Sequence, residues 1–166
     1  MTNIEEILST IEQVHKLEED KIVYVGKPSV AFFREYVLAH DNDFYEPLSG
    51  RVDIEAFVEK VHRLSTSFIL VIDGEVAGLI ASYFYDVPNE KGFITLTHTK
   101  KKYRGQHLST VLLKAVQDYA RSVHFKYIDL MVYKANIPAF NLYKKHGFEV
   151  LEDNNGRCLM RWKARL

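Results

Sequence analysis

The turn at residues 104–107, with the sequence RGQH, carries the residue types that point most directly to chemistry in this sequence of 166 residues. It follows a stretch at 93–99 that is rich in Thr and large apolar residues, which predicts a β-strand. From Leu108 onward apolar residues recur at helical spacing, so a helix is expected to begin there. A helix N-terminus offers free backbone N–H groups and a positive dipole end, and Arg104 adds a permanent charge with bidentate donors. The turn is therefore predicted to bind a pyrophosphate.

A second segment, 136–148 with the sequence NIPAFNLYKKHGF, contains the other residues of chemical interest. Pro138 near its start and Gly147 near its end predict a helix between them, following a strand at 127–133. Tyr143 on this helix has a phenol that is mostly protonated at neutral pH, so it could supply a proton to a leaving group. A tyrosine that faces a sheet is also common as a core residue whose hydroxyl reaches solvent. Both interpretations of Tyr143, proton donor and core residue, are open at this point.

The rest of the sequence supplies the elements that must position these two segments. Asp73-Gly74 separates two apolar strands and predicts a hairpin, because a type I′ turn requires two positive φ angles. A helix is expected at 2–19, from the capping-box pattern of Thr2 and Glu5 and from an apolar stripe. Further helices are expected at about 28–40 and at 53–64, and strands at 21–25, 67–72, 75–85, 148–151 and 158–162.

This order of elements indicates a mixed α/β (α+β) fold. A meander of three strands in the middle gives a central sheet that is mostly antiparallel. The crossover from 93–99 through a helix to 127–133 adds a parallel connection. No linker or repeat divides the sequence, so residues 1–166 are expected to form a single domain, with 1–20 as an additional N-terminal helix.

The two segments together resemble the GNAT superfamily of acyl-CoA-dependent N-acyltransferases. In that family an R-G-x-G-x-[GA] loop follows the fourth strand, and an N-x-x-A-x-x-L-Y-x-x-x-G-F segment follows the fifth. Here RGQHLS and NIPAFNLYKKHGF stand in those places, and the resemblance extends over residues 67–162. It implies a GNAT-like fold whose fourth and fifth strands splay apart, with helices on both faces of the sheet. It also implies acetyl-CoA as the co-substrate.

The resemblance further implies roles for individual residues. The strand end at 97–99 is expected to lie beside the pantetheine arm, where a backbone N–H polarises the thioester carbonyl. Asn136 is expected to hydrogen-bond the cofactor, and Tyr143 to protonate the departing CoA thiolate. The residues expected to bind the cofactor are Thr97, His98, Thr99, Arg104, Gly105, Gln106, His107, Leu108, Ser109, Asn136 and Tyr143.

Two residues of the loop depart from the family pattern. His107 stands where glycine is usual, and Ser109 stands where glycine or alanine is usual. Glycine would let the backbone approach a phosphate without a Cβ in the way. We expect His107 either to point outward or to donate to the pyrophosphate, whose negative charge favours imidazolium.

The sequence does not single out the general base that would accept a proton from an attacking amine. The strand at 93–99 contains no Asp or Glu, and His98 is its titratable residue. Strict alternation along this strand would place residues 94, 96 and 98 on one face of the sheet. The other candidates are Glu46, Asp41, Asp43 and a water chain from the strand at 83–85.

Composition and charge narrow the remaining possibilities. Residues 1–90 hold 7 basic and 17 acidic residues, whereas residues 91–166 hold 15 basic and 5 acidic residues. The net charge of the whole sequence is zero, but its second half is basic, which suits a phosphate-rich ligand. The acidic loop at 41–50 would suit a cationic, partly apolar amine, or it is an ordinary Asx-rich turn. No histidine spacing predicts a metal site, and the single cysteine, Cys158, is expected in the core.

We therefore expect a cytoplasmic N-acetyltransferase that needs no metal and moves the acetyl group of acetyl-CoA to a primary amine of a small molecule or peptide, by direct attack in a ternary complex. No secretory signal is visible, and neither a nucleic acid nor a membrane is expected as a partner. A homodimer is left open. A P-loop nucleotide hydrolase is excluded, because the turn lacks the Gly-Lys-[Ser/Thr] ending. The alternative is a CoA-binding regulatory or degenerate module without catalysis, which the unusual His107 and the undefined base keep open.

Overall fold

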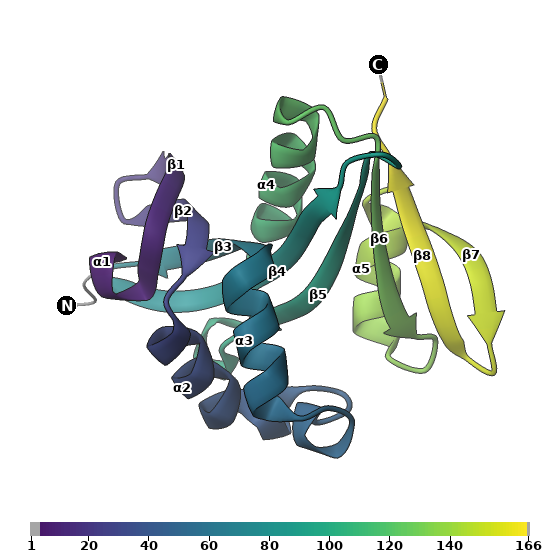
Figure 1. Cartoon of the computed structure of the whole chain (residues 1–166), viewed down its shortest axis with the longest axis horizontal. Coiled ribbons are helices and arrows are strands. Elements are labelled where there is room, and N and C mark those ends of the chain that lie inside the picture. Colours follow the sequence, from purple (N-terminus) through teal and green to yellow (C-terminus); the bar gives the residue numbers. More distant parts are fainter. Residues whose placement is uncertain (1–3, 166) are drawn as a thin grey trace.

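The computed structural model describes residues 4–165, and these residues build one eight-stranded sheet with helices on both of its faces (Figure 1). The strands are β1 Leu8–Glu18, β2 Lys21–Pro28, β3 Ser65–Ile72, β4 Glu75–Asp86, β5 Lys91–Thr99, β6 Tyr127–Tyr133, β7 Glu149–Asn154 and β8 Arg157–Lys163. The helices are α1 Ile4–Ile7, α2 Val30–His40, α3 Ile54–Leu64, α4 Leu108–Ser122 and α5 Ile137–Lys145, with 3-10 turns η1 Asp41–Asp43, η2 Leu48–Gly50 and η3 Lys101–Tyr103. The strand order is β1-β2-β3-β4-β5-β6-β8-β7, and only β5 and β6 pair in parallel among these strands.

Two apolar cores, one on each face of the sheet, hold the layers together. On one face Leu112 and Val116 of α4 pack in the same buried cluster as Phe68 of β3. On the other face Val37 of α2 packs in a cluster with Ile69 of β3. Strand β3 lies inside the sheet and is buried along its whole length, because successive side chains enter opposite cores. The expected fold class, a mostly antiparallel sheet covered on both faces, is confirmed.

Local turn and capping signals in the sequence lead to the corresponding backbone geometry. Asp73 and Gly74 both have positive φ, at 49° and 77°, as a type I′ hairpin turn between β3 and β4 requires. Ser29 caps α2 by accepting a hydrogen bond from the backbone N–H of Phe32 at 3.2 Å. Asp53 caps α3 in the same way. Short-range chemistry therefore fixes where most of the elements begin and end.

The N-terminal segment does not follow its local sequence signals, and the prediction of a helix at 2–19 is wrong. Thr2 lies outside the described residues; from residue 4 the chain forms a single helical turn, α1, and then the long strand β1. Strand β1 pairs antiparallel with β2 along its length and forms one edge of the sheet. The helical apolar stripe is not used, since Ile11 and Val14 remain 40% and 56% exposed. Pairing with the free edge of β2 satisfies the backbone groups of both strands, and this outweighs the local helical pattern.

A separation between β5 and β6 is the feature of the sheet that matters most for function. The two strands pair only from Lys91–Ile94 to Tyr127–Leu130, and beyond these residues they diverge (Figure 1). These are the fourth and fifth strands of the sequence analysis, renumbered because β1 precedes them. Strand β8 holds β6 in place on its far side, where Arg161 forms hydrogen bonds of 2.8 and 3.0 Å with the carboxylate of Asp129.

Within the described part of the chain, no helix is long and apolar enough to cross a membrane.

Candidate active site

A cleft of about 830 Å³ opens where β5 and β6 separate. One wall consists of the end of β5 and the turn that leads into α4, and the other consists of the end of β6 and the start of α5. The residues expected to bind the cofactor line this cleft, except Gln106, which is exposed in the same turn. The structure thus brings residues 97–99, 104, 105, 107–109, 136 and 143 around one cavity.

The turn into α4 has the geometry of an anion-binding site. Gly105 and His107 have φ angles of 82° and 60°, so two left-handed residues fold the chain back before the helix begins. His107 occupies the N-cap position of α4 but forms no side-chain capping bond, which leaves the first N–H groups of the helix free for a ligand. Arg104 is held at the mouth of the cleft, because its Nε donates to the carbonyl oxygen of Thr99 at 3.1 Å. The turn therefore combines a helix dipole with a fixed guanidinium.

A β-bulge in β5 decides which of its side chains face this cleft. The pairing of β5 with β4 shifts between Ile94 and Leu96, so the strict alternation expected from the sequence is wrong at this point. Ile94 lies in the core under α4, whereas Leu96 lies in the core under α2 and α3. After the bulge Thr97 faces α5 and His98 faces α2, as their contacts below show. The bulge also lies where pairing with β6 stops, so the backbone beyond Ile94 has no strand beside it on that edge.

Tyr143 reaches β5 from α5. Its side chain is only 7% exposed, and its hydroxyl donates to Oγ1 of Thr97 at 3.4 Å. Burial raises the pKa of the Tyr143 phenol above its ordinary value of 10, against a smaller lowering by Thr97, so the proton is retained at neutral pH. At the start of α5 the side chain of Asn136 lines the cleft and does not cap the helix. The helix thus presents a neutral proton donor and an amide to the same cavity.

His98 is buried in a hydrogen-bonded network that faces α2. Its Nδ1 lies 2.7 Å from the hydroxyl of Tyr36, and its Nε2 lies 3.2 Å from Oδ2 of Asp43. Burial raises the pKa of Tyr36, so the phenol donates to Nδ1 and Nε2–H donates to Asp43. Both ring nitrogens are therefore occupied, and this arrangement leaves no lone pair on His98 for an incoming amine.

The network predicts a specific pH dependence of stability. Burial lowers the pKa of His98 from 6.5 to about 4, although the hydrogen bond with Asp43 acts in the opposite direction. Between these two values the unfolded chain binds a proton that the folded protein excludes, so a fall in pH through this window favours unfolding. The free energy of unfolding should drop by up to about 3 kcal/mol from this residue alone.

Urea unfolding of the wild type and of His98→Gln between pH 4 and 7 measures this contribution. The variant should be less stable at pH 7, but its stability should fall less steeply as the pH is lowered. Replacement of the exposed His15 by Gln is the matched control and should leave the slope unchanged. Equal slopes in the wild type and His98→Gln would contradict the assignment of a neutral buried imidazole.

His40, Asp43 and His98 form a cluster that histidine spacing did not indicate. Each offers one potential ligand atom, and the three atoms lie within 4.8 Å of one another. Hydrogen bonds account for this proximity, since His40 Nδ1 and His98 Nε2 both lie within 3.3 Å of Oδ2 of Asp43. The ammonium of Lys101 lies 3.3 Å from Oδ1 and balances the carboxylate charge. We therefore assign no cation to this cluster.

The loop between α2 and α3 closes the cleft on the side of β6. Glu46 accepts a hydrogen bond from the hydroxyl of Tyr133, and the ring of Tyr45 packs on that of Tyr133 at 5.4 Å. Arg51 lies 3.8 Å from the other carboxylate oxygen of Glu46. Neither Tyr133 nor Arg51 was anticipated from the sequence; the only signal was that Tyr133 ends a strand beside the second motif. Glu46 is thus a carboxylate on the cleft wall, whereas Asp41 is bonded to Ser49 outside it.

His107→Gly is expected to preserve the fold and weaken cofactor binding. A non-glycine residue at φ 60° carries a backbone cost of about 1 kcal/mol, so glycine should leave stability equal or slightly higher. His107 lines the cleft, and we predict that its imidazole donates to a phosphate; removing it should then raise the acetyl-CoA Kd about threefold to tenfold, as calorimetry can measure. Gln106→Gly is the matched control, because its side chain does not line the cleft. Unchanged or tighter binding in His107→Gly would remove the donor role.

Comparison with known proteins agrees with this geometry. The family model described as the acetyltransferase (GNAT) family matches residues 17–148. PaiA N-acetyltransferase from Thermoplasma acidophilum, solved with coenzyme A, has a TM-score of 0.67 at 16% identity over 86% of this chain and 99% of its own. The ribosomal-protein-S18-alanine N-acetyltransferase of Escherichia coli gives 0.68 at 15% identity, over 87% and 95%. A GNAT family acetyltransferase from Elizabethkingia anophelis with acetyl-CoA bound gives 0.66 at 15%, over 89% and 100%. No curated protein sequence matches significantly.

This chain shares its fold with these acetyltransferase structures over 86–89% of its length. The structural matches, at such low identity, establish the fold. The family match covers most of the sequence and establishes the activity class. This chain belongs to the GNAT family and is an acetyltransferase.

Proposed function

We propose that the protein transfers the acetyl group of acetyl-CoA to a primary amine, by direct attack in a ternary complex. The observation that carries this proposal is that the N-terminus of α4 and the Tyr143 hydroxyl open onto one cleft, beside an edge of β5 that no strand occupies. The pyrophosphate would bind at 104–109, and the pantetheine amides would pair with the free backbone of 97–99. The thioester would then lie beside Tyr143.

The reaction would proceed without an acyl-enzyme. The amine nitrogen attacks the thioester carbonyl carbon, a C–N bond forms and the C–S bond breaks, while a backbone N–H of β5 stabilises the oxyanion. The CoA thiolate takes the proton of the Tyr143 phenol. The proton that the amine loses passes to the Glu46 carboxylate, the acid that lines the cleft without a short ion pair. Cys158, the only cysteine, is buried in the core away from the cleft, so it carries no acetyl group.

The neighbouring structures support the cofactor assignment. One contains coenzyme A and another contains acetyl-CoA, and this chain shares their fold over most of its length. The basic character of residues 91–166, which hold the whole α4 turn, fits a ligand with phosphate groups.

A thiol-release assay with acetyl-CoA tests the proposal against pooled primary amines and peptides. Release of CoA that depends on an added amine, together with mass-spectrometric detection of the acetylated amine, is the expected result. Tight binding of acetyl-CoA with no release across the whole panel would instead support a CoA-binding module without catalysis.

A further inference from the structure

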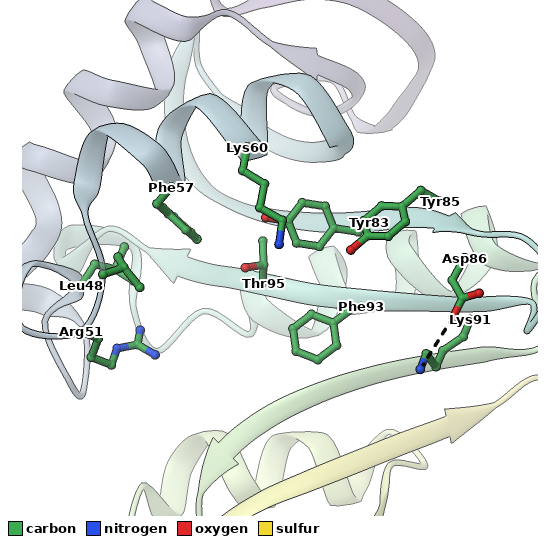
Figure 2. A pocket seen from close by; sticks show the side chains of 11 residues that line it. Leu48, Arg51, Phe57, Lys60, Tyr83, Tyr85, Asp86, Lys91, Phe93 and Thr95 are labelled. Atoms are coloured by element: carbon green, nitrogen blue, oxygen red, sulfur yellow. Dashed lines mark ion pairs between the residues drawn. The ribbon is translucent and has the colours of Figure 1, made fainter.

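A second cavity, of about 470 Å³, lies on the face of β5 opposite the cofactor cleft, between α3, the η2 loop and strands β4 and β5 (Figure 2). Three residues, Arg51, Phe93 and Thr95, line both this cavity and the cleft. The β5 bulge is the reason that the two spaces meet, because it leaves Thr95 facing the α3 side just before Thr97 turns toward Tyr143. A molecule in the second cavity can therefore extend an amine toward the thioester without crossing the cofactor.

The charges of this cavity are predominantly positive. Its lining includes Arg51, Lys60 and Lys91, against a single acid, Asp86. Lys91 lies 3.8 Å from Asp86, and Arg51 lies 3.8 Å from Glu46. Lys60 makes no ion pair with any residue of the described chain, and its ammonium sits 5.1 Å from the centre of the Tyr83 ring. Figure 2 shows Lys60 extending from α3 toward Tyr83 and Thr95, with Arg51 on the other side of the space. An anion is the ligand that would complement Lys60.

Two of the three acids in the 41–50 loop are neutralised by nearby donors, and none of the three lines this cavity. Asp41 bonds to Ser49, and Asp43 bonds to His98 and to the ammonium of Lys101. Although burial raises the pKa of Asp43, its hydrogen bonds with His98, Lys101 and His40 together hold it below its ordinary value, so it stays an internally neutralised anion. Glu46, the third acid, lines the cofactor cleft and not this cavity.

The remaining surface of the cavity is apolar and aromatic. Leu48, Phe57, Tyr83 and Phe93 line it, and Leu48 and Tyr83 are almost fully buried. A volume of about 470 Å³ falls within the range of about 300–1,000 Å³ typical of small-ligand pockets. Such a space suits one aromatic or branched side chain. A long polyamine suits it poorly, because the positive charges of that ligand would meet Lys60.

We propose that the acceptor is a free apolar amino acid, whose side chain fills this cavity and whose carboxylate is bound by Lys60. The inference rests on the proposed function, because it places the amine of the same molecule at the junction formed by Thr95 and Phe93. Acetylation would convert that amine to an amide and leave the carboxylate bound. Specificity for amino acids would then arise from Lys60, which binds the carboxylate, and from the aromatic lining, which contacts the apolar side chain.

Paired acceptors test the carboxylate requirement. Thiol release is measured with phenylalanine and leucine and with their carboxamides, in the wild type and in Lys60→Met, which retains the apolar stem and removes the charge. Because a carboxamide also weakens the basicity of the amine, the informative quantity is the change in the acid-to-amide ratio of kcat/KM between the two proteins. We expect Lys60→Met to lower this ratio about tenfold, mainly through KM of the amino acid.

Two further variants sharpen the test. Lys16→Met is the matched control, since this exposed lysine on β1 lies outside the cavity, and its ratio should stay near that of the wild type. Lys60→Glu should reverse the preference and favour the carboxamides. Calorimetry of N-acetylphenylalanine binding to the CoA complex gives a readout independent of turnover, and Lys60→Met should weaken it about tenfold.

The outcomes separate this inference from the proposed function. An acid-to-amide ratio that Lys60→Met leaves unchanged, or turnover confined to amines without a carboxylate, would overturn the amino acid acceptor while acetyl transfer stands. Release of no thiol with any amine, together with no binding of N-acetylphenylalanine, would overturn both.

Discussion

Replacing Tyr143 by phenylalanine should lower kcat for acetyl transfer by about 10²–10⁴, the contribution typical of a positioned general acid. The substitution removes only the hydroxyl, which makes a single long hydrogen bond of 3.4 Å to Thr97, so the fold and the acetyl-CoA Kd should change little. Because burial raises the pKa of this phenol above its ordinary value, Tyr143 should stay protonated at neutral pH in the wild type. Single-turnover kinetics at pH 7–8, with Kd measured separately, make the distinction between chemistry and binding.

Thr97→Val is the control for this experiment. It removes the partner of the same hydrogen bond but leaves the phenol in the cleft, so its kcat should remain within a few-fold of the wild type. A Tyr143→Phe enzyme with unchanged turnover would remove Tyr143 from the acid role. An equal loss of kcat in both variants would show that the hydrogen bond between Tyr143 and Thr97 matters, and not proton donation by the phenol.

Glu46→Gln should produce the second largest effect, a fall in kcat/KM of about 10²–10⁴ at neutral pH if Glu46 is the general base. Glutamine keeps an oxygen that can accept the hydrogen bond from Tyr133, so the loop should still close the cleft. A base must accept the proton that the amine loses, and the glutamine amide cannot do so. Steady-state thiol release at pH 7–8 measures kcat/KM of the two proteins.

Tyr133→Phe distinguishes a role of Glu46 as the general base from a role in holding the loop closed. This substitution breaks the same contact but leaves the carboxylate free to accept a proton. If Glu46 is the base, Tyr133→Phe should cost far less activity than Glu46→Gln. Comparable losses in the two variants would show that Glu46 only holds the loop and that water carries the proton instead.

Much of the fold followed from short-range signals in the sequence. The Asp73-Gly74 turn, the caps at Ser29 and Asp53, and the change from strand to helix around 104–107 each depend on residues within one turn of one another. The RGQHLS and NIPAFNLYKKHGF segments marked the two walls of the cleft for the same reason, because each wall is a single strand–turn–helix unit.

The N-terminal segment shows where local reasoning stopped being sufficient. Ile11 and Val14 follow helical spacing, yet the chain there pairs with β2 and leaves both side chains largely exposed. Gly26 on β2 permits the close approach, since a Cβ at that position would lie 1.9 Å from the carbonyl oxygen of Thr10. Hydrogen bonds to a strand at a different place in the sequence decided the outcome, and no local pattern encodes that partner.

The assignment of faces along β5 failed for a related reason. Alternation predicts one face for residues 94, 96 and 98, but the bulge between Ile94 and Leu96 moves Ile94 to the opposite core. Its position depends on the register of β4 against β5, which only the assembled sheet defines. As a consequence His98 faces Tyr36 and Asp43, while Thr97 faces Tyr143.

The sequence by itself determined the two strand–turn–helix units that form the walls of the cleft, because the turn at 104–109 and the helix carrying Tyr143 are continuous segments whose chemistry is local. Only the tertiary structure decided the acceptor side. Lys60, Tyr83 and Phe93 lie on three separate elements and meet only when α3 packs over β4 and β5. The acids at 41–50 looked like a site for a cation in the sequence, but folding pairs Asp41 and Asp43 with nearby donors and leaves Lys60 as the unpaired charge among the described residues of the cavity. Net charge can be counted along a chain, whereas which charges remain unpaired depends on distances that only the fold sets.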